Sequence, residues 1–326
     1  PALFYFARWI APGFGFQPWV WWGLLLISAV VVGFDWWRRR PPLTPPDAGA
    51  WAFGAILLLT FLSRAWVAWE HPYPAWTDSL HHTLATALTA QNGRLPTDLL
   101  PYFDTPFSLY HLGLYAITGA AAQAAQAPAH SALLWTAQLL NTYVVLGVFL
   151  VLDRYVSRTA ALVGALTVGL LAHQPAFYVN WGRFTQLSSQ TIFLMAWVAA
   201  VEAIRGPLPW RAGDRRWAIA AAWLLAGLLT AAVFMLHFRV AAFYLLLLGP
   251  TVIYLGWRAG RSGRLGSMAL ATAGVGVVAL LLVSPLLWST LSKYIGLHIA
   301  LAQSNPLSQA QMNYLESHYF VFVFNV

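Results

Sequence analysis

The sequence predicts an all-α polytopic membrane protein: a bundle of about eight transmembrane helices with a long outward loop that contains short interfacial helices. Three observations support this fold class. Apolar stretches of about 20 residues, the length that crosses a bilayer core, recur along nearly the whole chain. Only 9% of the residues are charged, against roughly 25% in an ordinary soluble domain. The alternating pattern that is typical of a membrane β-barrel does not occur.

Composition also excludes several functional classes. The chain contains no cysteine, which excludes disulfides, thiol catalysis and Cys-ligated metals. It has no Walker loop, GxGxxG turn, HExxH or GxSxG motif, so nucleotide-driven transport and common hydrolase chemistries have no support. Arginines in cytoplasmic loops explain the net charge of +8, and we expect no nucleic-acid partner. The sequence looks truncated at both ends, Pro1 and Val326, so we expect it to be part of a longer protein.

Loop charge gives the expected topology. We expect spans at 18–37, 51–70, 131–152, 159–178, 191–204, 217–236, 240–257 and 267–288. The arginine-rich loops at 36–42, 153–158, 204–217 and 257–264 alternate with loops that hold few arginines. By the positive-inside rule these four loops are cytoplasmic, so the others face outward: 71–130, 179–190, 237–239 and 289–326.

Two shorter apolar segments do not fit as spans. Residues 107–122 predict a helix that lies in or dips into the outer leaflet. The first segment, "PALFYFARWIAPGFGF", predicts the remnant of an earlier span or an interfacial piece. We therefore divide the chain into an extra span with a proline-rich linker (1–49), a seven-span module that includes the loop 71–130 (50–288), and an outward segment that leads to a further C-terminal part (289–326).

The outward stretch "WTDSLHH" predicts a helix that starts at Thr77 or Asp78 and stops at Asn92-Gly93. Three ionisable side chains, Asp78, His81 and His82, then share one helix face and can act on one ligand. Together they also form a set of N and O ligands that suits Zn²⁺ with one open position. The alternative is that Asp78 only caps the helix and the histidines are interfacial.

Later outward loops bring cations to the same side of the membrane. Arg183, the only charge in "HQPAFYVNWGRFTQLSSQ", suits bidentate contact with a phosphate, although snorkelling to lipid headgroups is an alternative. His237 and Arg239, in "MLHFRV", could supply a second phosphate contact or an interfacial anchor. Further polar candidates are Tyr178, Asn180, Gln186 and Asp104. On the cytoplasmic side, Glu202 and Arg205 predict a local ion pair.

This pattern resembles the GT-C glycosyltransferase superfamily, which includes protein mannosyltransferases, oligosaccharyltransferases and aminoarabinose transferases. The resemblance covers about 50–326 and rests on the helix at 51–70, Asp78 in "WTDSLHH", the segment 107–122 and six later spans. The "NWGRFTQLSSQ" loop is similar to the second outward loop of bacterial and archaeal members. One departure is that no carboxylate lies between His173 and Glu202, where many metal-dependent relatives have one.

The resemblance implies inverting transfer of a sugar from a polyprenyl-phosphate carrier to an outward protein, lipid or glycan acceptor. It places the chain in the inner membrane of a prokaryote, with the active site facing outward. Asp78 would be the general base. Arg183, His237, Arg239 and His81 would bind the donor phosphate, with a divalent metal at Asp78, His81 and His82 as the alternative cofactor.

The competing class is a non-enzymatic integral membrane subunit. It could be a transporter or flippase for lipid carriers, or a cofactor-bearing component of an electron-transfer complex. Paired broken helices, which are typical of transporters, do not occur in the sequence. Most histidines lie at span ends or in loops rather than in mid-span, where a cofactor subunit would need them.

Overall fold

The computed structural model describes residues 1–39, 45–106, 110–206 and 215–303, and it confirms the all-α polytopic architecture. Within these residues, seven helices are long and apolar enough to cross a membrane. Their bounds are α2 (Pro18–Arg39), α3 (Ala48–Glu70), α6 (Ala129–Tyr155), α9 (Phe184–Arg205), α10 (Arg215–Leu236), α11 (Phe238–Arg261) and α12 (Leu265–Gln303).

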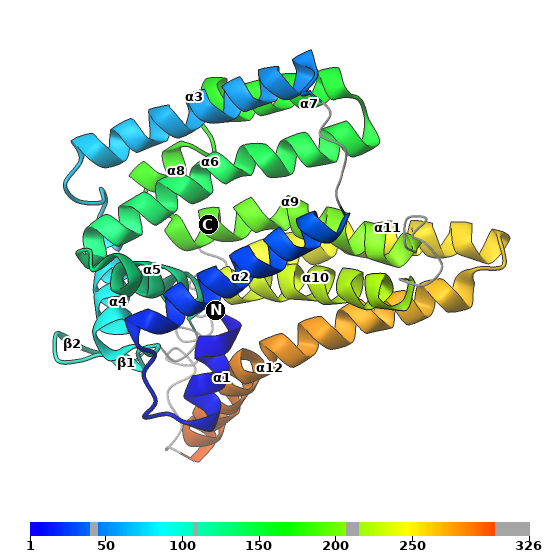
Figure 1. Ribbon diagram of the computed structural model, residues 1–326. Helices are drawn as coiled ribbons and strands as arrows, with labels where there is room; N and C mark the ends of the chain where they lie inside the picture. Colours follow the sequence, from blue (N-terminus) through cyan, green and yellow to red (C-terminus); the bar gives the residue numbers. More distant parts are fainter. Residues whose placement is uncertain (40–44, 107–109, 207–214, 304–326) are drawn as a thin grey trace.

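When the shorter apolar segment Arg158–Leu171 is counted with the long helices, successive members run in alternating directions, so their ends gather at two opposite ends of the bundle (Figure 1). One end, which we call the arginine end, holds the last residues of α2, α6, α9 and α11. The other, the α4 end, holds the connections after α3, α5 and α10 and the short helix α8 (Phe177–Asn180). The helix ends that flank the predicted arginine-rich loops therefore gather at one end, and those that flank the arginine-poor loops gather at the other.

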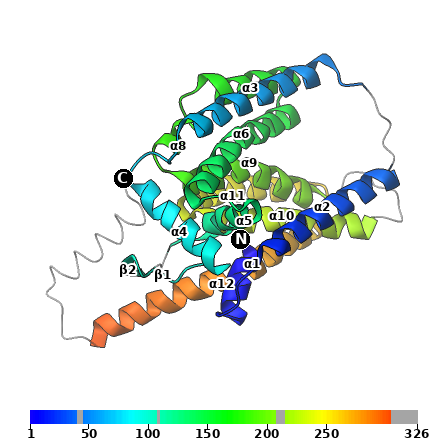
Figure 2. The ribbon, with the colours of Figure 1, turned by 60° about the vertical axis from the view of Figure 1, so that its left-hand side comes forward.

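The bundle is a stack of helices. α3 packs against α6, α6 against α9, α9 against α10, and α10 against α12 (Figure 1). α11 lies along α9, while α2 crosses the stack and contacts α5 (Gly113–Ala125) (Figure 2). α2 and α3 are mostly exposed, as expected of helices that face lipid.

The fourth predicted span, 159–178, is shorter than predicted. It consists of nine residues of α7 (Arg158–Leu166) and five of the π-helical turn η1 (Thr167–Leu171). At 1.5 Å per residue this segment is about 21 Å long, below the thickness of a bilayer core. Extended backbone follows at Ala172, and Pro175 then stands in the polar sequence "HQP". Proline lacks an N–H and cannot continue the helical ladder.

α9 begins at Phe184, within the predicted outward loop 179–190. This first part of the helix is polar but buried, and its hydroxyl groups are satisfied by carbonyls. The Ser188 hydroxyl donates to Phe184 O at 2.7 Å, and the Ser189 hydroxyl donates to Val233 O of α10 at 2.9 Å. Because such bonds let serine enter a helix interior, the polar composition does not mark a loop here.

The α4 end is covered by two short helices and a hairpin. α4 (Asp78–Asn92) packs on α5, with a 2.8 Å hydrogen bond between the hydroxyls of Thr86 and Thr118. α4 stops at Asn92-Gly93, as predicted, and Gly93 adopts the left-handed conformation that often ends a helix. The hairpin pairs β1 (Asp98–Leu99) with β2 (Phe103–Pro106). α5 is largely buried and packs against α4 and α6. It forms most of the segment 107–122, for which we predicted a helix that lies in or dips into the outer leaflet; residues 107–109 of that segment lie outside the described part.

The first and last segments also pack onto this bundle. α1 (Ala2–Ile10) buries Phe4, whose ring stacks on Trp21 with centroids 5.1 Å apart. The Trp21 indole N–H donates to the Gln123 side-chain oxygen of α5 at 2.7 Å. α12 continues to Gln303, past the predicted end of its span at 288, while 304–326 of the predicted outward segment lies outside the described residues.

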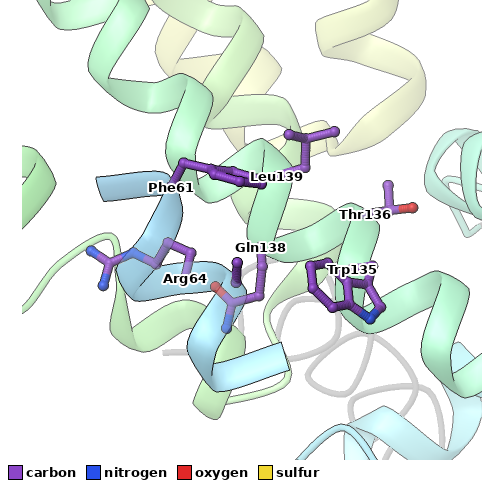
Figure 3. A pocket seen from close by; sticks show the side chains of 7 residues that line it. Phe61, Arg64, Trp135, Thr136, Gln138 and Leu139 are labelled. Atoms are coloured by element: carbon purple, nitrogen blue, oxygen red, sulfur yellow. The ribbon is translucent and has the colours of Figure 1, made fainter. Parts of the chain in front are cut away.

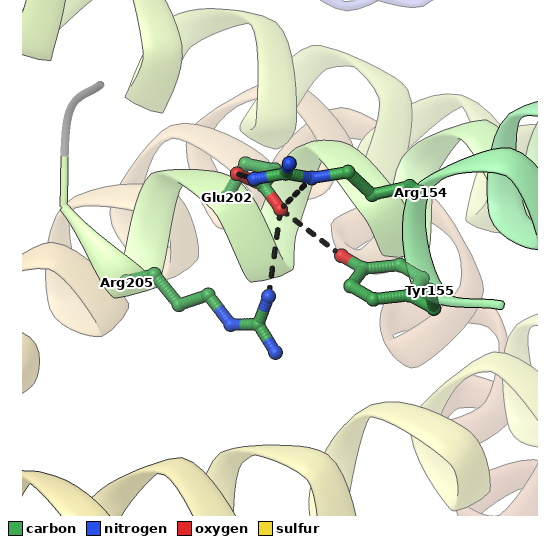
Figure 4. A network of polar contacts seen from close by, with 4 residues as sticks. All are labelled: Arg154, Tyr155, Glu202 and Arg205. Atoms are coloured by element: carbon green, nitrogen blue, oxygen red, sulfur yellow. Dashed lines mark hydrogen bonds and ion pairs between the residues drawn. The ribbon is translucent and has the colours of Figure 1, made fainter. Parts of the chain in front are cut away.

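At the arginine end, Glu202 links two helices (Figure 4). Its carboxylate accepts two hydrogen bonds from Arg154 of α6, at 3.0 and 2.9 Å, and one from the Tyr155 hydroxyl at 3.2 Å. The predicted pair with Arg205 is confirmed at 3.6 Å. This bidentate network joins α6 to α9 where both helices end.

We predict that Gly113→Ala destabilises the fold by about 1–3 kcal/mol, the usual cost of overpacking. A β-carbon at Gly113 would meet the backbone carbonyl of Met235, where α5 crosses the end of α10. Detergent-solubilised protein unfolded with increasing SDS measures the loss. The matched control is Gly249→Ala in α11, where a β-carbon meets nothing within 4 Å. Equal stability of the two variants would contradict the tight crossing.

Candidate functional site

The predicted base and the predicted phosphate-binding arginine meet at the α4 end. Asp78 is the first residue of α4 and Arg183 precedes α9, and their side chains form an ion pair with an N–O distance of 3.7 Å. Both are accessible, with 45% and 35% of their side chains exposed. The Arg183 guanidinium also lies over the Trp181 ring, 4.8 Å from its centroid.

A tight approach of two backbone segments makes this pairing feasible. Gly182 adopts φ +64°, a conformation that side chains disfavour. A β-carbon there would lie 3.4 Å from the Asp78 β-carbon and 3.2 Å from the Ser79 hydroxyl oxygen. The turn before α9 therefore rests directly on the first turn of α4. Thr77 is the N-cap of α4 and makes no side-chain cap bond, so the first of the two predicted capping residues does not cap the helix.

The two neighbouring histidines of α4 differ in burial, because one side chain is buried in the bundle and the other is exposed. His82 is buried: its Nδ1 lies 2.8 Å from the Tyr115 hydroxyl, and its ring packs edge-on against Phe184. His81 remains exposed. Successive helical residues are rotated by about 100°, which is why the structure does not gather Asp78, His81 and His82 around one point. Among the described residues, no group of three or more histidine, aspartate or glutamate side chains is placed to hold a metal ion.

His237 and Arg239 lie in the same region, at the junction of α10 and α11. His237 is the N-cap of α11, and its ring centroid is 4.5 Å from that of His111. Burial lowers the pKa of His237 to about 4, with smaller contributions from the positive charges of Arg239 and Arg183 and from His82. Arg183 thus acts electrostatically on His237 as well as on Asp78, and the cations that we predicted from separate loops lie close together.

Three further members of the site were not among the predicted residues: Tyr110, His111 and Tyr115. Tyr110 is hydrogen-bonded to Thr185 and Tyr115, and its ring stacks on His111 with centroids 4.2 Å apart. One signal in the sequence could have identified them, since "YHLGLY" places a histidine and two tyrosines in an apolar segment, where polar groups are costly. We refer to the whole set as the polar cluster: Asp78, His82, Tyr110, His111, Tyr115, Arg183, His237 and Arg239.

The remaining predicted polar residues flank this cluster. The Gln186 amide donates to the Tyr178 hydroxyl at 3.3 Å, and the Tyr178 ring is nearly parallel to that of Trp181. Asn180 lines a neighbouring cavity. The predicted site residue Asp104 has a side chain that lies outside the described part of the structure.

Two cavities follow the seam between α3 and α6. The larger, about 360 Å³, is lined mostly by apolar surface, with Phe61, Arg64 and Gln138 among its walls (Figure 3). Arg64 donates from Nη2 to the carbonyl of Gly169 in η1 at 2.8 Å. The smaller, about 270 Å³, is lined by residues that include Val67 of α3 and Asn180 of α8. Asn180 belongs to the segment that leads to Arg183, so the seam approaches the polar cluster.

Charge defines what the polar cluster can do. It contains two arginines and three histidines but only one carboxylate, Asp78, which pairs with Arg183. Such an excess of cationic and proton-accepting groups favours an anionic ligand. The exposed carboxylate beside it can accept a proton. Searches of protein-family models, curated proteins and solved structures find no match to this chain.

We predict that stability falls as the pH drops from about 6.5 to about 4, in part because of His82. Burial lowers the pKa of folded His82 from 6.5 to about 4; a hydrogen bond to the Gly182 backbone opposes this shift, and the charges of His81 and Arg183 add smaller contributions to it. The unfolded chain therefore binds the proton first, and each such histidine costs up to about 1.4 kcal/mol per pH unit in this window.

SDS unfolding of His82→Gln at pH 7.5, 6 and 5 measures this contribution. The variant should lose less stability on acidification than the wild type. The control is His130→Gln, which should keep the wild-type pH dependence because the His130 ring contacts Tyr73, outside the polar cluster, with centroids 4.6 Å apart. An unchanged pH dependence in His82→Gln would show that His82 is not held neutral.

Proposed function

We propose that the chain is a membrane glycosyltransferase of the GT-C type, located in a prokaryotic inner membrane. It transfers a sugar from a polyprenyl-phosphate carrier to an acceptor on the outward side, with inversion at the anomeric carbon. One observation carries the proposal: Asp78 and Arg183, from the two outward loops that the resemblance singles out, form an ion pair in the accessible part of the polar cluster.

The pair suits the two halves of such a reaction. Asp78 would accept the proton of the attacking acceptor group, for which a carboxylate within hydrogen-bond reach is required. Arg183 would face the phosphate, whose negative charge grows as the glycosidic bond breaks. A bound phosphate competes with Asp78 for the guanidinium, because bidentate contacts to phosphate are strong. Donor binding would then free the carboxylate for the acceptor.

The lipid part of the donor needs an apolar path to this site. The seam between α3 and α6 offers two cavities, and the smaller is bounded by Asn180, close in sequence to Arg183. A prenyl chain in the seam would place its phosphate toward Arg183. His237 and Arg239 would complete the phosphate contacts from the turn between α10 and α11.

We predict that Asp78→Asn lowers transfer about 10²- to 10⁴-fold, the range that a general base contributes. The assay supplies purified protein with a panel of polyprenyl-phosphate sugars and host membrane extract as the acceptor source, and measures release of polyprenyl phosphate by mass spectrometry. The control is Asp98→Asn, in the hairpin, where the carboxylate accepts hydrogen bonds from Thr97 and Leu100 instead of an arginine. It should retain transfer.

Wild-type turnover by Asp78→Asn would remove Asp78 from the catalytic role. If the wild-type protein releases no polyprenyl phosphate from any sugar in the panel but binds the donors, the result supports the competing class, a non-enzymatic subunit that handles lipid carriers.

We predict that Arg183→Lys lowers kcat/KM for the lipid donor about 10- to 100-fold. Lysine keeps the charge but loses the planar bidentate contact and the packing over Trp181. The matched control is Arg94→Lys, since Arg94 is exposed and donates to the carbonyl of Pro12 away from the polar cluster. Equal effects of the two substitutions would refute a specific phosphate contact at Arg183.

A further inference from the structure

Two histidines in the polar cluster, His111 and His237, each have a buried ring nitrogen without a hydrogen-bond partner. His111 is only 7% exposed, and the rings of His111 and His237 are 4.5 Å apart at an angle of 58°. Nε2 of His111 and Nδ1 of His237 are both buried and make no hydrogen bond. A buried polar atom without a partner costs about 1–3 kcal/mol. Two such atoms on facing rings therefore point to a ligand that supplies the missing contacts.

The groups around the pair determine the charge of that ligand. His111 lies within the electrostatic reach of His82 and Arg239, and its ring stacks on Tyr110. His237 lies within reach of Arg239, Arg183 and His82. The one carboxylate of the cluster, Asp78, is paired with Arg183. An excess of positive charge with unpaired hydrogen-bonding nitrogens favours an anion whose oxygens accept hydrogen bonds.

A metal ion fits these surroundings less well. A transition metal held by two histidines needs further protein or solvent ligands, and no suitable group of three is found in the described residues. The nearby arginines would also repel a divalent cation. An oxyanion, by contrast, is attracted by Arg183 and Arg239 and can accept from both rings.

We propose that His111 and His237 form a protonatable clamp for an oxyanion, the phosphate of the lipid-linked donor, and that the clamp takes up a proton when the anion binds. The identity of the anion rests on the proposed function, whereas the clamp itself rests on the two facing rings. Each ring donates an N–H to a phosphate oxygen. Binding breaks no covalent bond, and the proton comes from solvent.

The direction of proton transfer follows from electrostatics. In the free protein, burial, and secondarily the charge of neighbouring groups, lowers the pKa of His111 well below 6.5 and that of His237 to about 4. Both rings are then neutral at pH 7. A bound anion stabilises the charged form and raises the pKa of the pair. Protons are taken up wherever the pH lies between the free and bound values, so affinity falls as pH rises through the bound-state value.

Proton uptake can be measured with a probe that does not itself titrate. Inorganic sulfate keeps its charge between pH 5 and 8, so any proton bound belongs to the protein. Titration calorimetry of purified protein at pH 6, in two buffers with different ionisation enthalpies, gives the number of protons taken up. The clamp predicts uptake that approaches one proton per bound sulfate, and an affinity that falls between pH 5.5 and 8.

Substitution by glutamine separates donation from protonation, because glutamine donates an N–H but cannot take up a proton. His111→Gln and His237→Gln should each weaken sulfate binding at pH 6 about 10- to 100-fold, the value of one charge-assisted hydrogen bond, and reduce the uptake. The matched control, His130→Gln, should keep the wild-type sulfate affinity and the wild-type proton uptake. His237 is only half-buried, so its variant tests the clamp even where the more buried His111 variant fails to fold.

Sulfate binding without proton uptake, or with wild-type uptake in His237→Gln, would overturn the clamp. Retained transfer activity in that case would leave the proposed function intact. Conversely, if the protein shows proton uptake that depends on both histidines but has no transferase activity, the result supports the clamp and not the proposed function.

Comparison of geranyl phosphate with inorganic phosphate assigns the ligand: tighter binding of geranyl phosphate indicates a prenyl carrier, and equal binding indicates free phosphate.

Discussion

The ion pair between Asp78 and Arg183 is the contact on which the site depends. It joins the start of α4 to the turn before α9, two elements from different parts of the chain. An exposed pair of this kind adds little to stability. Its importance is positional, because it fixes a carboxylate and a guanidinium at one point of the α4 end. The other cationic groups of the cluster are arranged around that point.

Close packing beneath the pair supports this arrangement. Gly182 lets the turn before α9 rest on α4, and Gly113 lets α5 cross the end of α10. Between them, His82 is held by Tyr115 and Phe184 in the buried layer. Polar groups at the surface are thus supported by apolar and hydrogen-bonded contacts below. The excess of positive charge in this region costs energy in the empty site, and an anionic ligand would relieve it.

Much of the fold follows from local sequence. Apolar length and arginine placement predict the long helices and the two ends of the bundle, and Asn92-Gly93 predicts where α4 stops. The ion pair of Glu202 with Arg205 is also local, three residues apart on one helix. These features depend on residues that are near one another in the chain, which is why periodicity and composition are sufficient to predict them.

The structure differs from the sequence-based predictions where contacts between distant parts of the chain determine the conformation. The first turns of α9 look like a loop because they are polar, yet their hydroxyls bond to carbonyls within the helix and on α10. The segment 159–178 looks like a full span, but its helix ends at Leu171, before Pro175. Nothing local indicates that His111 faces His237, since that contact depends on how α5 crosses the junction of α10 and α11. The membership of the polar cluster was therefore only partly predictable.

A structure of the protein bound to a polyprenyl phosphate would show whether the donor phosphate lies at the Asp78–Arg183 pair. We expect phosphate density within hydrogen-bond distance of the Arg183 guanidinium, bordered by His237 and Arg239, with Asp78 released from the arginine and open to the outward side. Phosphate density elsewhere, for instance beside Arg64 in the α3–α6 seam with the Asp78–Arg183 pair intact, would contradict it.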